Sequence, residues 1–485
     1  MKQVLQQTKN STVVRALPVK RLKSLEGWAM VQSAPSYVWQ PQSVDQIRDV
    51  LFLAQQNGRT VAVRGSGYSY TDATLNSEDV VIDLSQMRRI LAWDASQGLI
   101  TVEPGVTIRD LWQATIADGW WPNVVPGTMR PTIGGCVAMN VHGKNAWLSG
   151  SFGEHVVAID VLTPNGALQT YTAEQHPEQM HAFIGGLGLL GIITQITLQL
   201  KRVSSGLLKV QQHAAHSLAE MFELFNNEIP HADYLVGWID GFASGASFGR
   251  GLIDCATVSD QNDQRYLQPT SQDVSSHLLG FIPRDQLWRG MGPLFTDVGM
   301  RLANNAQFSK GIVQARRGSQ MVPHAQFHFY HDYVPNWKRA WLPGGLRQLQ
   351  VFVPYAEAPS VFRELLARSQ QAGLYPYLCV MKQHRNDDAF LLPYQCDGFS
   401  LSLDYRVTAQ NRDTLDKVLR ELAGLTISAN GRFYLAKDDV LDDTMYTQTI
   451  GQERVDRFLS LKEEYDPAMI LQSNLYRRVL RRRVV

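Results

Sequence analysis

The chain has 485 residues, of which 44% are apolar and 19% are charged, as in an ordinary globular protein with two domains or one large domain with an insertion. Its formal net charge of +1 argues against a nucleic-acid-binding protein that depends on bulk positive charge. Four scattered cysteines form no CxxC pair, so neither a metal site nor a disulfide framework is expected.

The first predicted elements are a helix over 44–58 and a short β-branched strand over 60–63. Apolar side chains recur at helical spacing in the helix, and Ser43 with Gln46 forms a predicted capping box at its start. Further strands are predicted over 80–84 and 99–102, and a second amphipathic helix over 107–119.

A segment dense in glycine, 126–153, has few long apolar side chains and is not typical of a core. Such a composition suits backbone that passes close to a ligand. A buried strand is predicted over 157–162, and a second glycine run, 185–191, precedes a strand of alternating pattern over 192–200.

The composition changes after Lys201. The segment 201–414 is richer in aromatic residues, and alternation over 348–353 and 401–405 predicts an antiparallel sheet. The segment 258–320 is expected to be the least regular, with mobile loops. A helix over 454–465 is predicted to end at Asp466-Pro467.

The loop Arg64-Gly65-Ser66-Gly67-Tyr68-Ser69 follows a predicted strand directly. Glycines allow tight curvature, so that successive backbone N–H groups converge on an anion, which suits a pyrophosphate. The loop has neither the G-x-G-x-x-G spacing of a Rossmann fold nor the Gly-Lys-Ser/Thr of a Walker loop. Taken alone, it is equally consistent with a turn that binds nothing.

The order of the motifs is more specific than this loop. R-G-x-G-x-S, P-G-T, G-G, H-G-K-N, G-S-F-G and G-G-x-G-x-x-G-I-I follow one another along the chain. This series resembles the FAD domain of the vanillyl-alcohol-oxidase superfamily. The segments 142–145, 150–153 and 431–438 are similar to the decaprenylphosphoryl-ribose oxidase family within it.

The resemblance implies an α+β fold, in which a PCMH-type FAD-binding domain carries an inserted antiparallel-sheet substrate domain. The implied domains are 1–200 for FAD binding, 201–414 for substrate binding, and a C-terminal segment, 415–485, that returns to the FAD domain and completes the active site. The implied FAD contacts are Val63, Arg64, Gly65, Ser66, Gly67, Tyr68, Ser69, Tyr70, Thr71, Asp72, Ala73, Gly127, Thr132, Ile133, Gly134, Gly135, Met139, Asn140, Val141, His142, Ile193 and Tyr434.

Two catalytic residues are implied, Lys437 as the base and His142 beside the flavin. A lysine has a reference pKa near 10.4, so it needs burial and a second cation, such as Lys144 or Lys382, to act as a base near neutral pH. The implied substrate contacts are Tyr70, Lys144, Gln350 and Lys382. Outside the resemblance, a lysine in Ala-Lys-Asp is usually a surface residue, and a lone histidine is usually a core residue.

Two departures from the family pattern bear on cofactor and substrate. Tyr68 stands where covalently tethered members often carry histidine, so noncovalent FAD is expected. Ser402 and Ser400 stand where mycobacterial members carry cysteine and asparagine, which puts the identity of the substrate in doubt.

The implied function is oxidation of a sugar hydroxyl to a ketone, at C2 of a polyprenyl-phosphoryl pentose, with a separate keto-reductase as partner. The alternatives are an oxidase of a soluble sugar, alditol or aldonolactone, and a flavin-binding protein without catalysis. No nucleic-acid partner is expected. The residues Arg477, Arg478, Arg481, Arg482 and Arg483 form either a solvated terminal face or a contact with anionic lipid. The first 23 residues do not resemble a signal peptide, so a cytoplasmic location, with possible peripheral membrane contact, is expected.

Overall fold

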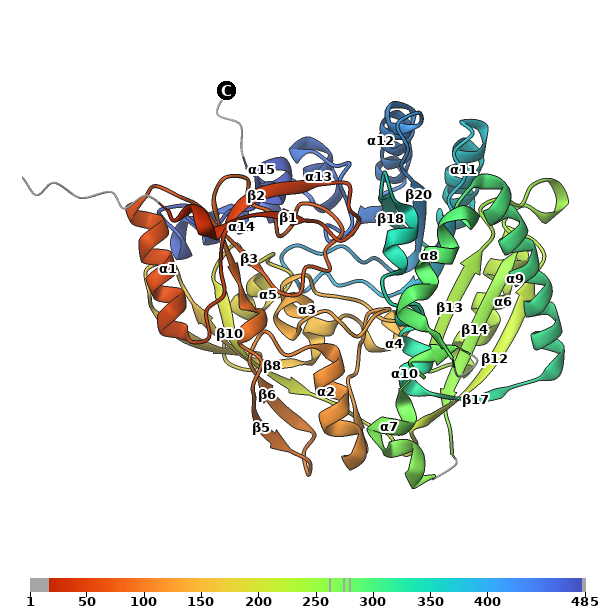
Figure 1. The fold of residues 1–485 in the computed structure, drawn as a ribbon, viewed down its shortest axis with the longest axis horizontal. Coiled ribbons are helices and arrows are strands. Elements are labelled where there is room, and N and C mark those ends of the chain that lie inside the picture. Colours follow the sequence, from red (N-terminus) through yellow and green to blue (C-terminus); the bar gives the residue numbers. More distant parts are fainter. Residues whose placement is uncertain (1–16, 261–262, 274, 279–280, 482–485) are drawn as a thin grey trace, which may run out of the picture.

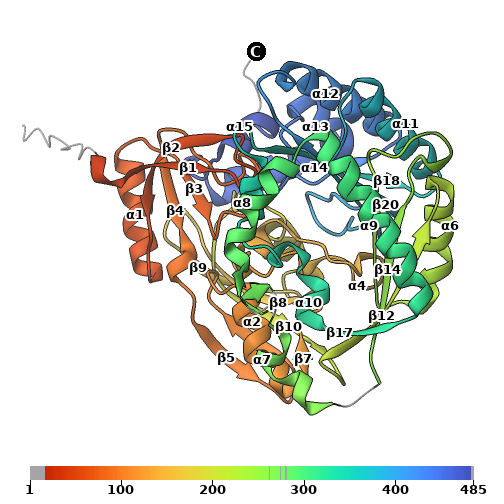
Figure 2. The same ribbon diagram turned by 45° about the vertical axis from the view of Figure 1, so that its right-hand side comes forward.

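The computed structural model describes residues 17–260, 263–273, 275–278 and 281–481. An N-terminal part, red to yellow in Figure 1, lies beside a large sheet built mainly from the green and blue segments. The blue C-terminal helices lie along the top of both parts (Figures 1 and 2). This mixed architecture, with a large antiparallel sheet, confirms the predicted fold class.

A four-stranded sheet begins the N-terminal part, in the order β1 (Leu22–Glu26), β2 (Ser33–Trp39), β4 (Val80–Asp83) and β3 (Val61–Arg64). The predicted first helix is α1 (Val44–Gln56), and it buries Ile47, Val50, Leu51 and Ala54. The Ser43 side chain accepts from the backbone N–H of Gln46, as a capping residue does. The loop that follows β3 is the glycine loop identified in the sequence.

A five-stranded antiparallel sheet follows. Its order is β5 (Ile90–Asp94), β6 (Leu99–Val102), β10 (Ile192–Gln199), β8 (Val156–Leu162) and β9 (Leu168–Thr172). The associated helices are α2 (Ile108–Thr115), α3 (Ile133–Ala138), α4 (Ala146–Ser149) and α5 (Pro177–Phe183), and β7 (Trp120–Trp121) pairs with β11 (Lys201–Arg202). The short helix α3 begins at Thr132, whose side chain accepts from the backbone N–H of Gly135.

The large sheet has eight strands, and every neighbouring pair is antiparallel. Its order is β17 (Gln320–Pro323), β12 (Leu207–Ala215), β14 (Gly251–Val258), β13 (Tyr234–Ile239), β19 (Leu378–His384), β20 (Gly398–Arg406), β18 (Leu346–Pro354) and β21 (Arg432–Phe433). The helices α6 (Leu218–Glu228), α11 (Ala358–Gln371) and α12 (Arg412–Ser428) pack against it. The last strand, β21, comes from the C-terminal segment.

The expectation that 258–320 is irregular is wrong over α9 (Asp297–Arg317), a helix of 21 residues. Only three residues of this helix are buried, Asn304, Phe308 and Gly311. Because so little of its surface packs against the protein, its sequence has no apolar stripe that would predict a helix. The rest of the segment is made of short elements, α7 (Pro269–Gln272), β15 (His277–Leu278), β16 (Ile282–Pro283) and α8 (Leu287–Met291). The helix α10 (His324–His328) follows β17.

The C-terminal segment forms α13 (Asp443–Ile450), α14 (Gln452–Tyr465) and α15 (Asn474–Val479). The predicted helix over 454–465 is confirmed as α14, which begins slightly earlier. Between α14 and α15 the chain pairs with β3, because the N–H of Val61 donates to Ile470 O at 2.7 Å and the N–H of Gln472 donates to Val61 O at 2.9 Å. The end of the chain therefore lies against the strand that leads into the glycine loop.

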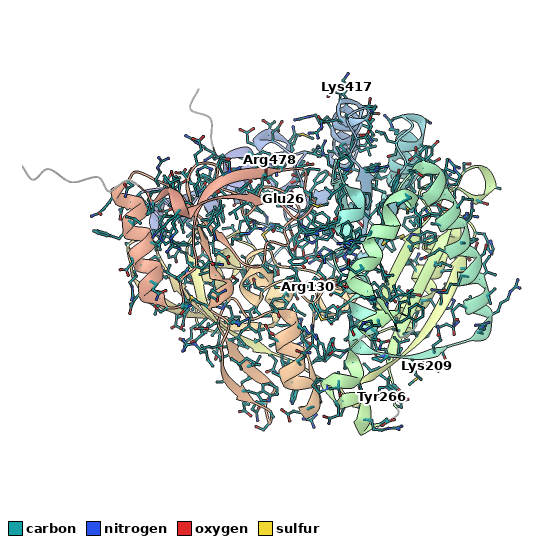
Figure 3. The ribbon with its side chains drawn as sticks, in the orientation of Figure 1. Glu26, Arg130, Lys209, Tyr266, Lys417 and Arg478 are labelled. Atoms are coloured by element: carbon teal, nitrogen blue, oxygen red, sulfur yellow. The ribbon has the colours of Figure 1, made fainter. Side chains whose placement is uncertain are left out.

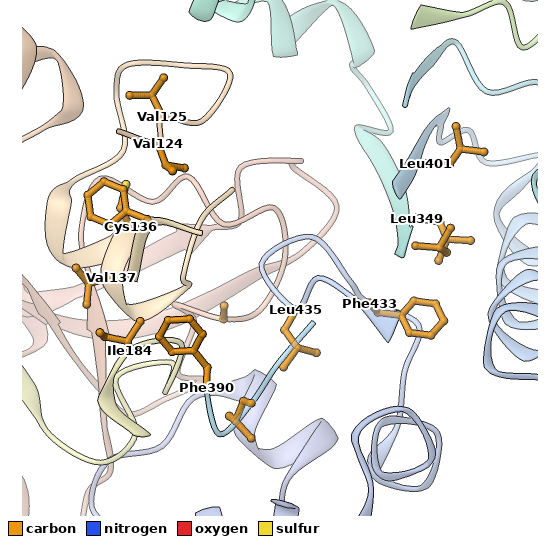
Figure 4. Packing of buried hydrophobic residues seen from close by; sticks show 14 of the residues in the cluster. Val124, Val125, Cys136, Val137, Ile184, Leu349, Phe390, Leu401, Phe433 and Leu435 are labelled. Carbon is orange, nitrogen blue, oxygen red and sulfur yellow. The ribbon is translucent and has the colours of Figure 1, made fainter. Parts of the chain in front are cut away.

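One hydrophobic cluster runs from the N-terminal part into the large sheet. Figure 4 shows Cys136 and Val137 of α3 on one side, Leu349 and Leu401 of the large sheet on the other, and Leu435 between them. The parts on either side of the cavity described below are therefore joined by close packing. No helix within the described ranges is long and apolar enough to cross a membrane.

Lys462 and Asp466 form a fully buried ion pair that fixes α14 against the N-terminal part. The Lys462 ammonium donates to Asp466 Oδ2 at 2.9 Å, to Leu189 O at 2.9 Å and to Leu471 O at 2.7 Å, so all three of its donors are used. The pair joins α14, the second glycine run and the segment beside β3.

We expect Lys462→Met to lower the free energy of unfolding by about 3 kcal/mol, because it leaves a buried carboxylate without its cation. Urea unfolding followed by circular dichroism measures the change. Lys417→Met, on the exposed side of α12 (Figure 3), is the control and should stay within about 0.5 kcal/mol of the wild type. Equal stabilities of the two variants would contradict the structural role of the pair.

Candidate active site

A single cavity lies where the glycine loop after β3, the start of α3, the second glycine run and the segment 434–437 meet. Most of the sequence-predicted cofactor and catalytic residues line it: Val63, Arg64, Gly65, Ser66, Gly67, Tyr68, Ser69, Tyr70, Ala73, Gly127, Thr132, Gly134, Gly135, Met139, Val141, His142, Ile193, Tyr434 and Lys437. Lys382 reaches the same wall from β19. The structure thus brings together residues from five separate segments of the chain, 63–73, 127–142, 193, 382 and 434–437.

Four predicted cofactor residues do not line this cavity: Thr71, Asp72, Ile133 and Asn140. All four have structural contacts instead. Thr71 and Asp72 bond to the C-terminal segment, Ile133 is fully buried in the core, and the Asn140 side chain accepts from the N–H of Gly153 at 2.9 Å. They shape the site from behind its wall.

The glycine loop is built for close approach. A Cβ on Gly65 would lie 2.1 Å from Thr132 Oγ1, so glycine is what lets the loop touch the first residue before α3. Gly67 has a φ of +73°, in the left-handed region that favours glycine. Among the described residues, none accepts a hydrogen bond from the backbone N–H groups of 66–69. Free N–H groups on a curved loop fit the pyrophosphate of FAD.

Two lysines, Lys437 and Lys382, line the cavity together with Arg64. Both are partly exposed, and the exposed part belongs to the cavity wall. Burial lowers the pKa of Lys437 to about 8, although the negative charge of Asp404 acts to raise it. Removal from water and the charge of Lys437 lower the pKa of Lys382 to about 7. Among the described residues, the lysine ion pairs are those of Lys201 and Lys462, so neither cavity lysine has a carboxylate partner.

Lys437 lies beside Tyr70, with its Nζ 4.9 Å from the centre of the phenol ring. The N–H of Tyr70 donates to Ala436 O at 2.8 Å, so the backbone of the loop is bonded to the residue before Lys437. Burial holds the pKa of Tyr70 well above its usual value, so its hydroxyl stays protonated. The loop and the lysine segment therefore form one wall.

His142 is held at both ring nitrogens. Its Nε2 accepts from the side-chain amide of Gln350 at 3.0 Å, so the proton is on Nδ1, which lies 3.1 Å from the hydroxyl of Tyr394. That hydroxyl donates to Asn140 O at 2.6 Å. Burial, with Lys382 as a smaller cause, lowers the pKa of His142 well below its usual range. The ring is neutral and fixed.

Two of the four predicted substrate contacts, Lys144 and Gln350, do not line the cavity, and neither do the two serines at which the chain departs from the family pattern. Lys144 donates to Phe327 O, and its Nζ lies 3.6 Å from the centre of the Tyr330 ring, outside the cavity wall. Gln350 stands behind His142, and the hydroxyl of Ser400 lies 2.8 Å from His384 Nε2. Neither Ser400 nor Ser402 lines the cavity.

Several wall residues were missed in the sequence. One of them, His331, has a titratable side chain. Its backbone N–H donates to Gly127 O at 3.3 Å, and burial and the cavity lysines lower its pKa to about 3. Trp28 stacks on Tyr70 with ring centres 4.6 Å apart. His331 lies in a short aromatic segment that contains no motif. Its position at the cavity wall becomes apparent only in the structure, where it contacts Gly127.

The arginines at the end of the chain are partly inside the structure. Arg477 pairs with Asp79, and Arg478 pairs with Asp72 and Asp438. The expectation of a wholly solvated face, or of a lipid contact made by all five, is therefore wrong for these two. Arg481 is exposed, and Arg482 and Arg483 lie outside the described residues.

Comparisons with known proteins agree with this cavity. Residues 35–172 match the model of an FAD binding domain. Decaprenylphosphoryl-beta-D-ribose oxidase of Mycolicibacterium smegmatis is 28% identical over 94% of this chain and 97% of its own length. L-gulonolactone oxidase of Bos taurus is 30% identical over 36% of this chain and 39% of its own. D-arabinono-1,4-lactone oxidase of Yarrowia lipolytica is 28% identical over 37% of this chain and 35% of its own.

The FAD domain match covers the glycine loop, α3 and the 126–153 segment, which are the parts that form the cradle of the cavity. The similarity to the ribose oxidase extends over almost the whole chain, so it includes the large sheet and the C-terminal return. Residues 35–172 therefore form an FAD-binding domain of the PCMH type, and the chain is an FAD-dependent oxidoreductase.

Proposed function

We propose that the enzyme oxidises a secondary hydroxyl of a sugar to a ketone, at C2 of a polyprenyl-phosphoryl pentose. The observation that carries this proposal is the presence of two cavity lysines without carboxylate partners beside an FAD cradle. Bound FAD supplies the hydride acceptor that alcohol oxidation needs. The full-length similarity to a decaprenylphosphoryl-ribose oxidase supports the lipid-linked pentose as substrate.

Lys437 is the proposed proton acceptor for the substrate hydroxyl. With a pKa of about 8, a useful fraction of its amine is neutral near physiological pH, which an ordinary lysine does not provide. Among the described residues no hydrogen bond occupies its Nζ, and it stands at the cavity wall. Transfer of the hydroxyl proton to this nitrogen allows the carbon that bears the hydroxyl to give up its hydride.

Lys382 is proposed to bind the anionic part of the substrate. With a pKa of about 7, Lys382 is only partly charged near neutral pH, and a phosphate oxygen beside it would favour its charged form. His142 is proposed as a positioning residue, because both of its ring nitrogens are bonded to protein side chains and neither can take the substrate proton. Its edge faces Tyr434, with ring centres 5.1 Å apart, at the cavity wall.

FAD is proposed to be bound without a covalent tether. Tyr68 occupies the position at which tethered members often carry histidine, and its pKa is raised by burial, so the phenol stays protonated. The ketone product calls for a separate reductase if the overall change is an epimerisation. A lactone or soluble-sugar oxidase is the second candidate, and the local similarity to L-gulonolactone oxidase favours it.

The deciding experiment is anaerobic bleaching of the flavin absorbance. We expect the colour of the purified protein to be released by acid precipitation, and the native protein to be bleached by a short polyprenyl-phosphoryl ribofuranose but not by L-gulonolactone or free ribose. Bleaching by the lactone alone would favour the second candidate. Colour that stays in the acid pellet would contradict the noncovalent FAD, and a colourless protein that FAD cannot reconstitute would overturn the proposal.

Lys437→Met should lower kcat by roughly 10²- to 10⁴-fold, because it removes the proton acceptor and keeps the bulk of the side chain. The flavin content, read from the visible spectrum, should not change. Stopped-flow flavin reduction measures the rate without interference from the electron acceptor.

Lys382→Met is the contrasting variant. It should mainly raise KM for a phosphorylated substrate, since it removes the cation for the anionic group and leaves Lys437 in place. The assignment of Lys437 is wrong if its variant reduces the flavin as fast as the wild type.

We expect kcat to rise with pH across the pKa of Lys437, which is about 8, and to level off above it, because only the neutral amine accepts a proton. Asp404 raises that pKa, so Asp404→Asn should move the rising limb to lower pH. The pH profile of flavin reduction measures both.

The control for this shift is Asp413→Asn, in the exposed first turn of α12, which should leave the limb in place. A limb that moves to higher pH in Asp404→Asn, or a profile that falls as pH rises from 7 to 9, would contradict Lys437 as the base.

A further inference from the structure

The short C-terminal helix α15 is bonded to the segment that follows the glycine loop. The N–H of Asn474 donates to Leu75 O at 2.8 Å, and the N–H of Ser77 donates to the Asn474 side chain at 3.2 Å. Arg477 donates to Thr60 and Asn76 from the same helix. The helix is therefore fixed to the N-terminal part by contacts that do not involve Arg478.

Arg478 uses every donor of its guanidinium within the protein. Nε donates to Asp72 Oδ2 at 2.8 Å, and Nη2 donates to Asp72 Oδ1 at 2.9 Å. Nη1 donates to Asp438 Oδ2 at 2.8 Å and to Leu441 O at 2.6 Å. Nη2 also donates to Asp438 O at 2.9 Å. An arginine has five such N–H donors, and all five are directed at acceptors.

The two carboxylates lie behind the wall that the glycine loop and the lysine segment form, and neither lines the cavity. Asp72 ends the glycine loop, and Asp438 directly follows Lys437. Asp72 and Asp438 are only 5% and 2% exposed. A second bond joins the same places, since the hydroxyl of Thr71 donates to Asp438 O at 2.8 Å. Figure 3 shows Arg478 near the top of the molecule, above Glu26.

We propose that Arg478 is a positioning residue that sets the place of Lys437 against the flavin loop. The proposal rests on the proposed function, in which Lys437 is the base. The guanidinium bonds to Asp72 with two parallel hydrogen bonds and to both the side chain and the carbonyl of Asp438, so it fixes the distance between loop and lysine segment. Without it, two buried carboxylates would face each other and the segments would separate.

A planar, delocalised cation is needed for this geometry. A lysine at 478 would supply one point charge and three donors, and it could not bond in parallel to Asp72 while also reaching Asp438 and Leu441. Removal of the cation should therefore affect the environment of Lys437 before it affects the fold, because Asp438 keeps its bonds from the N–H groups of Val440 and Leu441.

The test compares Arg478→Gln with Arg477→Gln in the flavin-loaded protein. Arg477 comes from the same helix and also pairs with a carboxylate, Asp79, but it contacts neither Asp72 nor Asp438. The pH dependence of Lys437 acetylation by acetic anhydride, read by mass spectrometry, reports the pKa of its amine without any substrate. We expect the midpoint of Lys437 to rise by about one pH unit in Arg478→Gln and to stay unchanged in Arg477→Gln.

Turnover supplies the second reading. With the polyprenyl-phosphoryl ribofuranose, Arg478→Gln should lower kcat roughly 10- to 100-fold and change KM little, since a misplaced base slows the chemical step. Arg478→Lys keeps the positive charge and should recover only part of the rate. If the acetylation midpoint moves but no sugar reduces the wild-type flavin, the proposed function fails and the positioning role stands.

The proposal is overturned if Arg478→Gln and Arg477→Gln share the same Lys437 midpoint and the same kcat. If Arg478→Gln does not fold, Asp438→Asn takes its place, because it keeps the side-chain volume and removes only one partner of the guanidinium. An unchanged Lys437 midpoint in a folded Asp438→Asn protein would overturn the proposal equally.

Discussion

The cavity depends on a contact between two segments that are distant in the sequence. These are the loop after β3 and the residues on either side of Lys437. The backbone bond from Tyr70 to Ala436 and the side-chain bond from Thr71 to Asp438 close it. More than 360 residues separate the partners of that second bond, so the contact forms only when the end of the chain has returned to the N-terminal part. The cavity is therefore completed by a segment that lies far along the chain from the glycine loop.

The electrostatics of the cavity differ from those of the core. Lys462 is fully buried and is compensated by Asp466 and two carbonyl groups, which is how a structural lysine is held. Lys382 and Lys437 have lowered pKa values and no carboxylate partner among the described residues. Two such lysines in the wall of one cavity, beside free backbone N–H groups, favour a site that receives an anion.

The fold class and most of the cavity wall could be predicted from the sequence because glycine spacing carries them. A Cβ at Gly65 would clash with Thr132, and Gly67 has a positive φ, so both positions favour glycine. The spacing of the two glycines therefore reflects the shape of the loop. His331 and Trp28 could not be predicted, because they reach the wall through long-range packing. The helix α9 was missed because it is polar on nearly every side, and Arg478 was read as part of a surface tail because its carboxylate partners lie far away in sequence.

His142 illustrates why a motif residue needs its surroundings before a role is assigned. From the motif alone, it could act as an acid, a base or a contact. Gln350 donates a hydrogen bond to Nε2, and the N–H at Nδ1 donates one to the Tyr394 hydroxyl, so the neutral imidazole has no free lone pair. In the proposed function, proton transfer therefore uses Lys437, whose nitrogen has no such partner among the described residues, and the histidine supplies rigidity. The two residues predicted together as catalytic would then have different roles, one as the proton acceptor and one as a positioning residue.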